Sequence, residues 1–306
     1  MKEKIKNIRA YVVYEMYQRG ILKNHIHVHS IDETIDALVN TNNSLIRFGE
    51  GEIIMTEGLA TATQESNVEL GNRLREILLS TKDEDSDSIN QNGRLLISIY
   101  DIFEGLDAIR PQNRDFWRKH LLRSRKTYES TLNHKLIYEN TFLTRCYYSF
   151  EDKSKCQNWF DGIKNIWKDK NVILIEGVSS HIGIGNDLLD GCKMVKRIIG
   201  PSKDAYSHYE DILSKCIEIA EETKYSQSEL LFLIALGATA KPLAFDLYNK
   251  GYRVIDIGNV DLEYEWFLMG TIDKVDLPKH DIIGTDANKE AGFIDYLNEI
   301  VATVGC

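Results

Sequence analysis

The residues best placed to do chemistry in this sequence form an acidic run, Asp261-Leu262-Glu263-Tyr264-Glu265. Side chains at every second position share one face if the chain is extended, so the three carboxylates would lie together. Like charges held together are unfavourable unless a cation or an arginine neutralises them, and carboxylate oxygens suit Mg²⁺ or Mn²⁺. The run therefore predicts a metal or catalytic site.

A second acidic cluster is Gly49-Glu50-Gly51-Glu52, which Arg47 precedes. The glycines allow a sharp turn, which would place two carboxylates and a guanidinium at the end of a short strand. Such a group could hold a sugar hydroxyl, orient a metal ion or supply a general base. A solvated turn with an arginine–glutamate pair explains the same local pattern equally well.

Gly183 and Gly185 precede a predicted helix, in a spacing found in dinucleotide-binding loops. A dinucleotide site would need a third glycine at position 188, where this chain has Leu188, so an NAD site is disfavoured. A site for a nucleotide phosphate or ribose stays open, with Asn186 and Asp187 as hydrogen-bonding groups.

Two further loops join a predicted strand to a predicted helix. Ser202 is expected to be an N-cap, which explains it fully, and a contact to a nucleotide base or diphosphate would be an additional role. Gly237 and Thr239 open a helix whose free N–H groups and dipole suit a diphosphate. A tight turn with Thr239 as N-cap is the alternative.

Two groupings are disfavoured as sites. His25, His27 and His29 alternate and would share a strand face, but no paired cysteines or second histidine cluster accompany them, so a surface strand is favoured over a metal site. Ser179 and His181 lack a nucleophile elbow, which disfavours a serine hydrolase.

An α/β fold is needed to position these residues. Alternating strands and helices predict right-handed βαβ units and a Rossmann-like, largely parallel sheet flanked by helices. We expect strands at residues 44–48, 94–100, 141–148, 171–175, 195–199, 230–236 and 252–257, and helices at 115–126, from 187 on, 202–222 and 239–249. Ligands bind beyond the carboxyl ends of such strands. The loops after Phe48, Ile175, Ile199, Leu236 and Ile257 are therefore the candidates.

The outer segments of the chain are expected to be accessory. We predict a helical and extended N-terminal part at 1–40, a catalytic domain at 41–275 and a helical tail at 276–306 that packs on it. Residues 1–22 form an amphipathic helix that packs on the body, with peripheral membrane contact as the alternative. The acidic stretch 81–88 is expected to be an exposed loop.

Composition limits the classes of function. The chain has 306 residues and a formal net charge of −10, which disfavours nucleic-acid binding because phosphate neutralisation needs clustered basic residues. Its five cysteines are scattered, which disfavours disulfides and zinc and fits a reducing cytoplasm. No apolar run approaches the roughly 20 residues that span a bilayer.

Five segments in order give the chain a family resemblance. They are Ser44–Glu52, Gly185–Leu188, Pro201-Ser202, Leu236–Ala240 and Asp256–Trp266, each beside the end of a predicted strand. Taken together, and over residues 40 to 270, the chain resembles the GT-D-type glycosyltransferases. That family includes glucosyltransferases of bacterial serine-rich-repeat adhesins.

The resemblance implies a Rossmann-like fold, a UDP-sugar donor, and Mn²⁺ or Mg²⁺ held by an Asp-x-Glu motif that Asp261 and Glu263 match. Arg47, Glu50 and Glu52 match the family's Arg-Phe-Gly-Asp-Gly-Glu motif. Glu50 stands where aspartate is usual, so the charge is kept on a side chain one methylene longer. The donor sugar does not carry over from the family.

The resulting hypothesis is a metal-dependent hexosyltransferase that acts on a glycan or glycoprotein acceptor in bacterial surface-glycan or adhesin glycosylation. The metal would stabilise the UDP leaving group, the Gly183–Asp187 loop and the helix from Thr239 would cradle the nucleotide, and Glu52 or Glu265 would act as base. We expect a cytoplasmic location, open to the inner membrane face, and leave a homo-oligomer open. The alternatives are a metal-dependent phosphohydrolase or nucleotidyltransferase and a non-catalytic nucleotide-binding scaffold.

Overall fold

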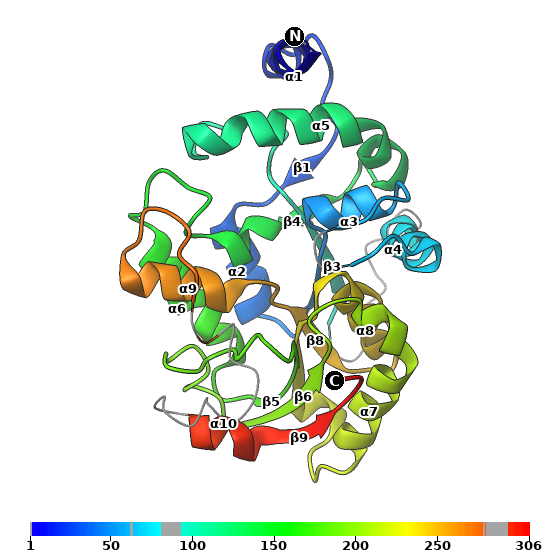
Figure 1. The fold of residues 1–306 in the computed structure, drawn as a ribbon, viewed down its shortest axis with the longest axis vertical. Helices are drawn as coiled ribbons and strands as arrows, with labels where there is room; N and C mark the ends of the chain where they lie inside the picture. The colour runs from blue at the N-terminus through cyan, green and yellow to red at the C-terminus, as the bar shows by residue number, and fades with distance from the viewer. Residues whose placement is uncertain (1, 62–63, 81–92, 278, 280–292) are drawn as a thin grey trace.

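One parallel sheet forms the centre of the computed structural model, which describes residues 2–61, 64–80, 93–277, 279 and 293–306 (Figure 1). Its described strands run in the order β1-β4-β3-β2-β8-β7-β5-β6-β9, and every pair of neighbours is parallel. The strands are β1 (His27–Val28), β2 (Ser44–Arg47), β3 (Leu95–Ile99), β4 (Ile137–Asn140), β5 (Asn171–Gly177), β6 (Met194–Gly200), β7 (Leu230–Ala235), β8 (Arg253–Asp256) and β9 (Ile300–Thr303).

Helices cover both faces of this sheet. Figure 1 shows α2, α6 and α9 on one side and α4, α7 and α8 on the other. The helices are α1 (Lys2–Gln18), α2 (Ile31–Val39), α3 (Glu50–Met55), α4 (Val68–Ser80), α5 (Pro111–Thr131), α6 (Cys156–Trp167), α7 (Tyr209–Glu221), α8 (Ala240–Asn249), α9 (Val260–Met269) and α10 (Phe293–Glu299), with 3₁₀ turns η1 (Thr141–Arg145), η2 (Ala205–His208), η3 (Gln227–Glu229) and η4 (Gly237–Thr239). The predicted Rossmann-like α/β class is confirmed.

The strand β7 and the middle of β5 are continuously apolar because helices cover both faces of the sheet. Val172, Leu174, Leu233 and Ile234 have no exposed surface, and β5 pairs with β7 from Asn171 onward. Continuous apolar runs of this kind are typical of parallel sheets that are buried on both sides. These strands form the rigid floor beneath the loops at their carboxyl ends.

The order of the strands reverses at the junction of β2 and β8. From β2 the chain proceeds to β3 and β4 on one side, whereas β5 to β8 all lie on the other side. The register pairs Leu45 with Ile255, which are far apart in sequence. A reversal of this kind leaves a crevice beyond the carboxyl ends of the two strands, and ligands bind there in α/β folds.

The two outer segments of the chain supply the two edges of the sheet. β1 pairs with β4 at one edge, and β9 pairs with β6 at the other. The C-terminal segment, expected to be a helical tail, therefore contains a strand as well as α10. Glu299 at the end of α10 pairs with Arg197 of β6 at 2.6 Å, which fastens this segment to the sheet.

The N-terminal helix packs on α5, as predicted. Ala10 and Tyr14 are buried, and the guanidinium of Arg118 lies 5.7 Å from the centre of the Tyr14 ring. Ile8 and Tyr11 stay exposed on the same helix. Among the described residues, no helix combines the length and apolar character that crossing a membrane requires.

The strand predicted at residues 141–148 is wrong, because the strand β4 ends at Asn140 and the 3₁₀ turn η1 follows. The side chain of Asn140 accepts a hydrogen bond from the backbone N–H of Phe142 at 3.0 Å. Such a cap turns the chain out of the sheet at this point. The buried apolar side chains of η1, among them Phe142 and Leu143, produced the strand-like pattern.

The helix predicted from residue 187 is also wrong, since residues 187–192 form turns. Gly183 and Gly185 adopt positive φ angles of 78° and 77°. The side chain of Asn186 then accepts from the Leu188 N–H at 3.0 Å, and the Trp167 indole donates to the Leu188 carbonyl at 2.8 Å. Both backbone groups of Leu188 are therefore used outside a helix.

The helix predicted from Ser202 begins later, at η2 and α7, so Ser202 is not its N-cap. Asp204 has a φ of 50°, in the left-handed region, and this separates Ser202 from the helix. Its carboxylate accepts from the backbone N–H of Glu65 at 2.6 Å. The acidic stretch 81–88 lies outside the described residues.

Candidate active site

A pocket of about 410 Å³ lies at the carboxyl ends of five neighbouring strands. β2, β5, β6, β7 and β8 contribute, in that order, Gly49, Gly177, Pro201, Gly237 and Gly258 at or just after their ends. The loops that the parallel-sheet rule indicated therefore surround one cavity.

The acidic cluster after β2 begins a helix, because Gly49 is the N-cap of α3. The carboxylate of Glu52, at the third position of the helix, accepts from the Gly49 N–H at 2.8 Å. A Cβ at Gly49 would lie 2.7 Å from this carboxylate, so a larger residue would displace Glu52 from this hydrogen bond. The turn thus holds Glu52 in one place beside the pocket.

Two positive and two negative side chains meet beneath the pocket. The ammonium of Lys241 lies 3.1 Å from Glu52 and 3.1 Å from Asp256, and it also donates to the Gly237 carbonyl at 3.0 Å. Arg47 lies 3.6 Å from Asp256. The alternative of an arginine–glutamate pair within the loop is not seen, because Arg47 pairs with Asp256 of β8.

Gly258 allows this cluster to form. A Cβ built on Gly258 would lie 1.6 Å from the Nη1 atom of Arg47, and the residue has a positive φ of 46°. A larger residue would displace the guanidinium. The side chain of Arg47 is only 7% exposed, and its Nε atom has no hydrogen-bond partner among the described residues.

Glu52 is held in its ionised form. Burial opposes its charge, but the neighbouring charges of Lys241 and Arg47 outweigh burial, and the pKa of Glu52 lies below its ordinary value. A general base is most effective when its pKa lies near the operating pH. Glu52 therefore suits a fixed negative charge that orders Lys241 better than it suits a base.

Glu50 has different surroundings, although it comes from the same turn. It lines the pocket, and within the described parts of the chain its carboxylate has neither a hydrogen bond nor an ion pair. Arg145 and Tyr100 line the same part of the cavity. The pKa of Arg145 is raised above its ordinary value, and the largest cause is Tyr100. Burial lowers this pKa, whereas the charge of Glu50 raises it further.

Ser202 joins two of the loops around the pocket. Its hydroxyl accepts from the Ser179 N–H at 3.1 Å and lies 2.7 Å from the Ser179 hydroxyl. A Cβ at Gly177 would lie 2.9 Å from the Ser202 Oγ atom, so the glycine permits this contact. Ser202 thus lines the pocket and fixes the loop after β5 against the loop after β6.

The acidic run after β8 is helical rather than extended, because it forms α9 with a buried apolar side. Residues two apart on a helix point to different sides, whereas residues four apart share one face. Asp261 and Glu263 therefore diverge, and the shared face predicted for all three carboxylates is wrong. Asp261 and Glu265 instead lie on the same face.

Glu263 anchors the segment that follows η1. Its Oε2 atom accepts from the backbone N–H groups of Tyr147 and Tyr148 at 3.0 and 2.7 Å. Burial raises the pKa of Glu263, and these two hydrogen bonds counteract part of that rise. Glu263 does not line the pocket, and its carboxylate supports the segment that follows Arg145.

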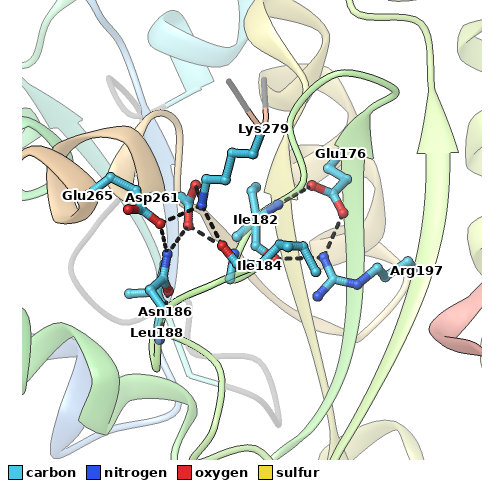
Figure 2. A network of polar contacts seen from close by, with 10 residues as sticks. Glu176, Ile182, Ile184, Asn186, Leu188, Arg197, Asp261, Glu265 and Lys279 are labelled. Atoms are coloured by element: carbon cyan, nitrogen blue, oxygen red, sulfur yellow. Dashed lines mark hydrogen bonds and ion pairs between the residues drawn. The ribbon is translucent and has the colours of Figure 1, made fainter. Parts of the chain in front are cut away.

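Asp261 and Glu265 converge on a lysine instead of on Glu263 (Figure 2). The ammonium of Lys279 lies 2.8 Å from Asp261 and 2.7 Å from Glu265. The second oxygen of Asp261 accepts from the Gly183 N–H and from the Asn186 amide, both at 2.9 Å. Of the three carboxylates of α9, only Asp261 lines the pocket.

The glycine loop that was expected to cradle a nucleotide lies behind the pocket wall. Gly183, Gly185, Asn186 and Asp187 do not line the cavity, and Asn186 donates to Asp261 and Glu265. Asp187 accepts from the Tyr264 hydroxyl, which is the main reason why its pKa is lowered. This loop supports the helix α9.

Gly237 lines the pocket but Thr239 does not. Thr239 lies in the turn η4, forms no capping hydrogen bond, and its hydroxyl has no hydrogen-bond partner among the described residues. Thr239 therefore occupies the N-cap position of α8, as the alternative interpretation had it, but its side chain does not cap the helix. The predicted position of Gly237, at the start of a helix beside the ligand cavity, agrees with the structure.

Five residues of this region escaped the sequence analysis as site residues: Tyr100, Arg145, Asp256, Lys241 and Lys279. Lys241 directly follows the turn of small residues at 237–240, and Asp256 ends a buried strand. The local sequence could therefore have indicated both. Arg145 and Tyr100 were hidden inside apolar segments. Lys279 had no local signal, because even its nearest partner in sequence, Glu265, lies 14 residues away and outside any shared motif.

The histidines at 25, 27 and 29 do not converge. His27 contacts Glu104 at 2.8 Å, and His29 contacts Glu139 at 3.2 Å. His25 instead stacks on the ring of His134. Within the described ranges, no three histidine, cysteine or acidic side chains are grouped as ligands of a metal ion.

A known family matches most of the chain. The model of the family described as "Glycosyltransferase GT-D fold" matches residues 45–283. Among curated proteins, a probable glycosyl transferase Gly of Streptococcus gordonii is 36% identical over 285 residues, and glycosyltransferase GlyD of Streptococcus pneumoniae is 34% identical over 282.

The matched segments cover 92% and 91% of this chain but only 39% and 33% of those two relatives. The chain therefore spans only about a third to two fifths of the length of the curated proteins that it resembles.

Solved structures agree over nearly the whole chain. One described as a highly conserved domain of unknown function 1792 with a distinct glycosyltransferase fold has a TM-score of 0.81 and 30% identity, covering 97% of this chain and 100% of that one. A new glycosyltransferase from Streptococcus sanguinis has a TM-score of 0.79 and 35% identity, covering 92% and 100%.

Proposed function

The chain belongs to the GT-D glycosyltransferase family, and from this we propose that it transfers a hexose from a UDP-sugar to a glycan or glycoprotein acceptor. The observation that carries the proposal is the pocket at the carboxyl ends of five parallel strands, where a free carboxylate, Glu50, lies close to a cation, Arg145. The anionic donor needs a cation beside it, and the nucleophilic hydroxyl of the acceptor needs a carboxylate that can accept its proton.

The donor diphosphate fits the side of the pocket formed by η4 and α8. The N-terminus of a helix carries free N–H groups and a partial positive charge, which favour phosphate. Arg145 adds a full charge with several donors, and a guanidinium can bind two phosphate oxygens at once. Lys241 is already engaged by Glu52 and Asp256, so Arg145 is the better candidate for the diphosphate.

Glu50 suits the role of the base that activates the acceptor. In the transfer, an acceptor oxygen forms a bond to the anomeric carbon as the bond from that carbon to the UDP oxygen breaks. The acceptor proton passes to the Glu50 carboxylate, and the negative charge that develops on UDP faces Arg145. This scheme applies to direct displacement, with Glu50 as the base in place of Glu52 or Glu265.

A divalent cation stays a prediction of the sequence. Mn²⁺ or Mg²⁺ would neutralise charge on the donor diphosphate when bound. Asp261 and Glu263 diverge on α9 and bind different groups, so they do not fit one metal ion as a pair in this structure. The proposed transfer is therefore described only through side chains of this protein.

The proposed activity is tested with a panel of nucleotide sugars, scored for UDP release and sugar transfer, with EDTA or with Mn²⁺. Glu50→Gln should lower kcat by about 10²–10⁴-fold and leave the donor KM nearly unchanged, because it removes the base and keeps the shape. Glu50→Asp is the matched control and should retain most activity, since the family has aspartate here.

Two results would contradict the proposal. If Glu50→Gln had the same kcat as the wild type, Glu50 would take no part in the chemistry. Release of phosphate or pyrophosphate without sugar transfer would favour a phosphohydrolase or nucleotidyltransferase.

A further inference from the structure

Lys279 occupies a built cation site next to the pocket. Its ammonium has three donors, and three oxygens surround it, from Asp261 at 2.8 Å, Glu265 at 2.7 Å and the Ile184 carbonyl at 3.0 Å (Figure 2). The side chain of Lys279 is only 8% exposed, and that of Asp261 only 3%. The ammonium therefore donates hydrogen bonds to Glu265 and to the Ile184 carbonyl and forms an ion pair with Asp261, in a place that water hardly reaches.

The two carboxylates need this charge. Asp261 and Glu265 are one helical turn apart on α9, and both also bind the single amide nitrogen of Asn186. Two negative charges this close repel each other unless a cation lies between them. Oxygen ligands of this kind would also suit a divalent cation, but the ammonium already takes the position that such a cation would need.

We infer that Lys279 is the resident cation of α9, in place of the divalent metal ion that the acidic run predicts. Lys279 also joins the segment after α9 to the loop that contains Ile182 and Ile184. Ile182 and Asp261 line the pocket, so Lys279 is a positioning residue for the pocket wall. The inference rests on the proposed function where it treats the pocket as an active site. Which cation occupies the site beside it can be measured without any enzymatic activity.

A second network holds the same loop from the other side. Arg197 donates to the Ile182 carbonyl at 2.8 Å and to Glu176 at 2.7 Å, while Glu176 accepts from the Ile182 N–H at 2.9 Å (Figure 2). The loop is therefore fixed between two buried ion-pair groups. Loss of one group leaves the other, so a Lys279 variant is expected to fold.

The experiment measures Mn²⁺ binding by the signal of free Mn²⁺ in electron paramagnetic resonance, and the melting temperature with and without Mn²⁺. Lys279→Met should melt about 5–10 °C below the wild type, because two buried carboxylates lose their counter-charge. It should gain Mn²⁺ binding at least about tenfold tighter than the wild type, and Mn²⁺ should restore part of the lost melting temperature.

Three control variants test the assignment. Lys274→Met removes an exposed lysine from the same segment and should change neither quantity. Asp261→Asn in the Lys279→Met background should abolish the gained Mn²⁺ binding. Lys279→Arg keeps the charge and should bind Mn²⁺ no better than the wild type.

Mn²⁺ binding by the wild type that Asp261→Asn abolishes would overturn the inference, because the metal would then hold the site. An unchanged melting temperature in Lys279→Met would overturn it as well. Absence of sugar transfer in the wild type would count against the proposed function and leave the result at Lys279 intact.

Discussion

Single residues of the pocket differ in role according to their charged neighbours. Glu50 and Glu52 are two residues apart and have the same side chain. Glu52 is fixed by Gly49 and Lys241, whereas Glu50 faces the cavity without a hydrogen bond or ion pair in the described structure. Lys241 lies between Glu52 and Asp256, so the buried charges of this cluster balance.

The cluster gives stability a defined dependence on pH. The pKa of Glu52 is lowered in the folded state, so its contribution is complete above its unfolded-state pKa, near 4.5. That contribution is lost as pH falls through the lower folded-state pKa. Glu52→Gln should therefore melt below the wild type at neutral pH, and the difference should shrink in acid.

Melting curves of both proteins between pH 3 and pH 7 measure this effect. Glu76→Gln, at a largely exposed position on α4, is the control and should behave as the wild type. If the difference in melting temperature between Glu52→Gln and the wild type stayed constant with pH, ionised Glu52 would not have the stabilising role assigned to it.

At the scale of elements, α9 decides what the acidic run does. A strand would have presented three carboxylates together, and a helix separates the middle one. Asp261 and Glu265 then face the loop after β5, and Glu263 faces the segment after η1. One short helix therefore ties together two loops that surround the pocket.

Glu263→Ala tests this helical role. It removes the acceptor of two buried backbone N–H groups, at Tyr147 and Tyr148, and should lower the free energy of unfolding by about 1–3 kcal/mol. Urea denaturation measures the loss. Because Arg145 precedes this turn, the donor KM should rise also.

Glu263→Gln retains one acceptor oxygen and should lose less stability than Glu263→Ala. If Glu263→Ala were as stable as the wild type but had lost Mn²⁺ binding, Glu263 would be a metal ligand and the anchoring role would be wrong.

At the scale of the whole molecule, segments at both ends of the described chain complete the sheet. β9 covers the edge of β6, with Arg197 paired to Ile300 and Ile199 to Thr303. An uncovered edge strand offers its backbone groups to other chains. The C-terminal segment thus protects the sheet and, through Lys279, also contacts the helix beside the pocket.

A chain that ends at residue 299 should melt at a lower temperature and aggregate sooner on heating, because the edge of β6 is exposed. Calorimetry with light scattering measures both. A chain that lacks only Cys306 keeps β9 and is the control. Equal melting and aggregation of the two truncated chains would show that β9 does not protect the edge.

Local pattern determined the class of fold and the place of the site. Apolar runs at 171–175 and 230–236 are strands because a sheet covered on both faces buries every side chain. Parallel strands bring their carboxyl ends to one edge, so Gly49, Gly177 and Gly237 were expected to meet, and they do.

Tertiary structure alone decided the partners of the charged residues. Whether residues 261–265 form a strand or a helix depends on what they pack against. A strand would bring all three carboxylates together, whereas the helix brings together only Asp261 and Glu265. Lys279 approaches Asp261 and Glu265 from beyond the end of their helix, and Lys241 approaches Glu52 across a long stretch of sequence. A sequence states which charges a chain carries, but the free energy of burying them depends on neighbours that only the folded chain brings together.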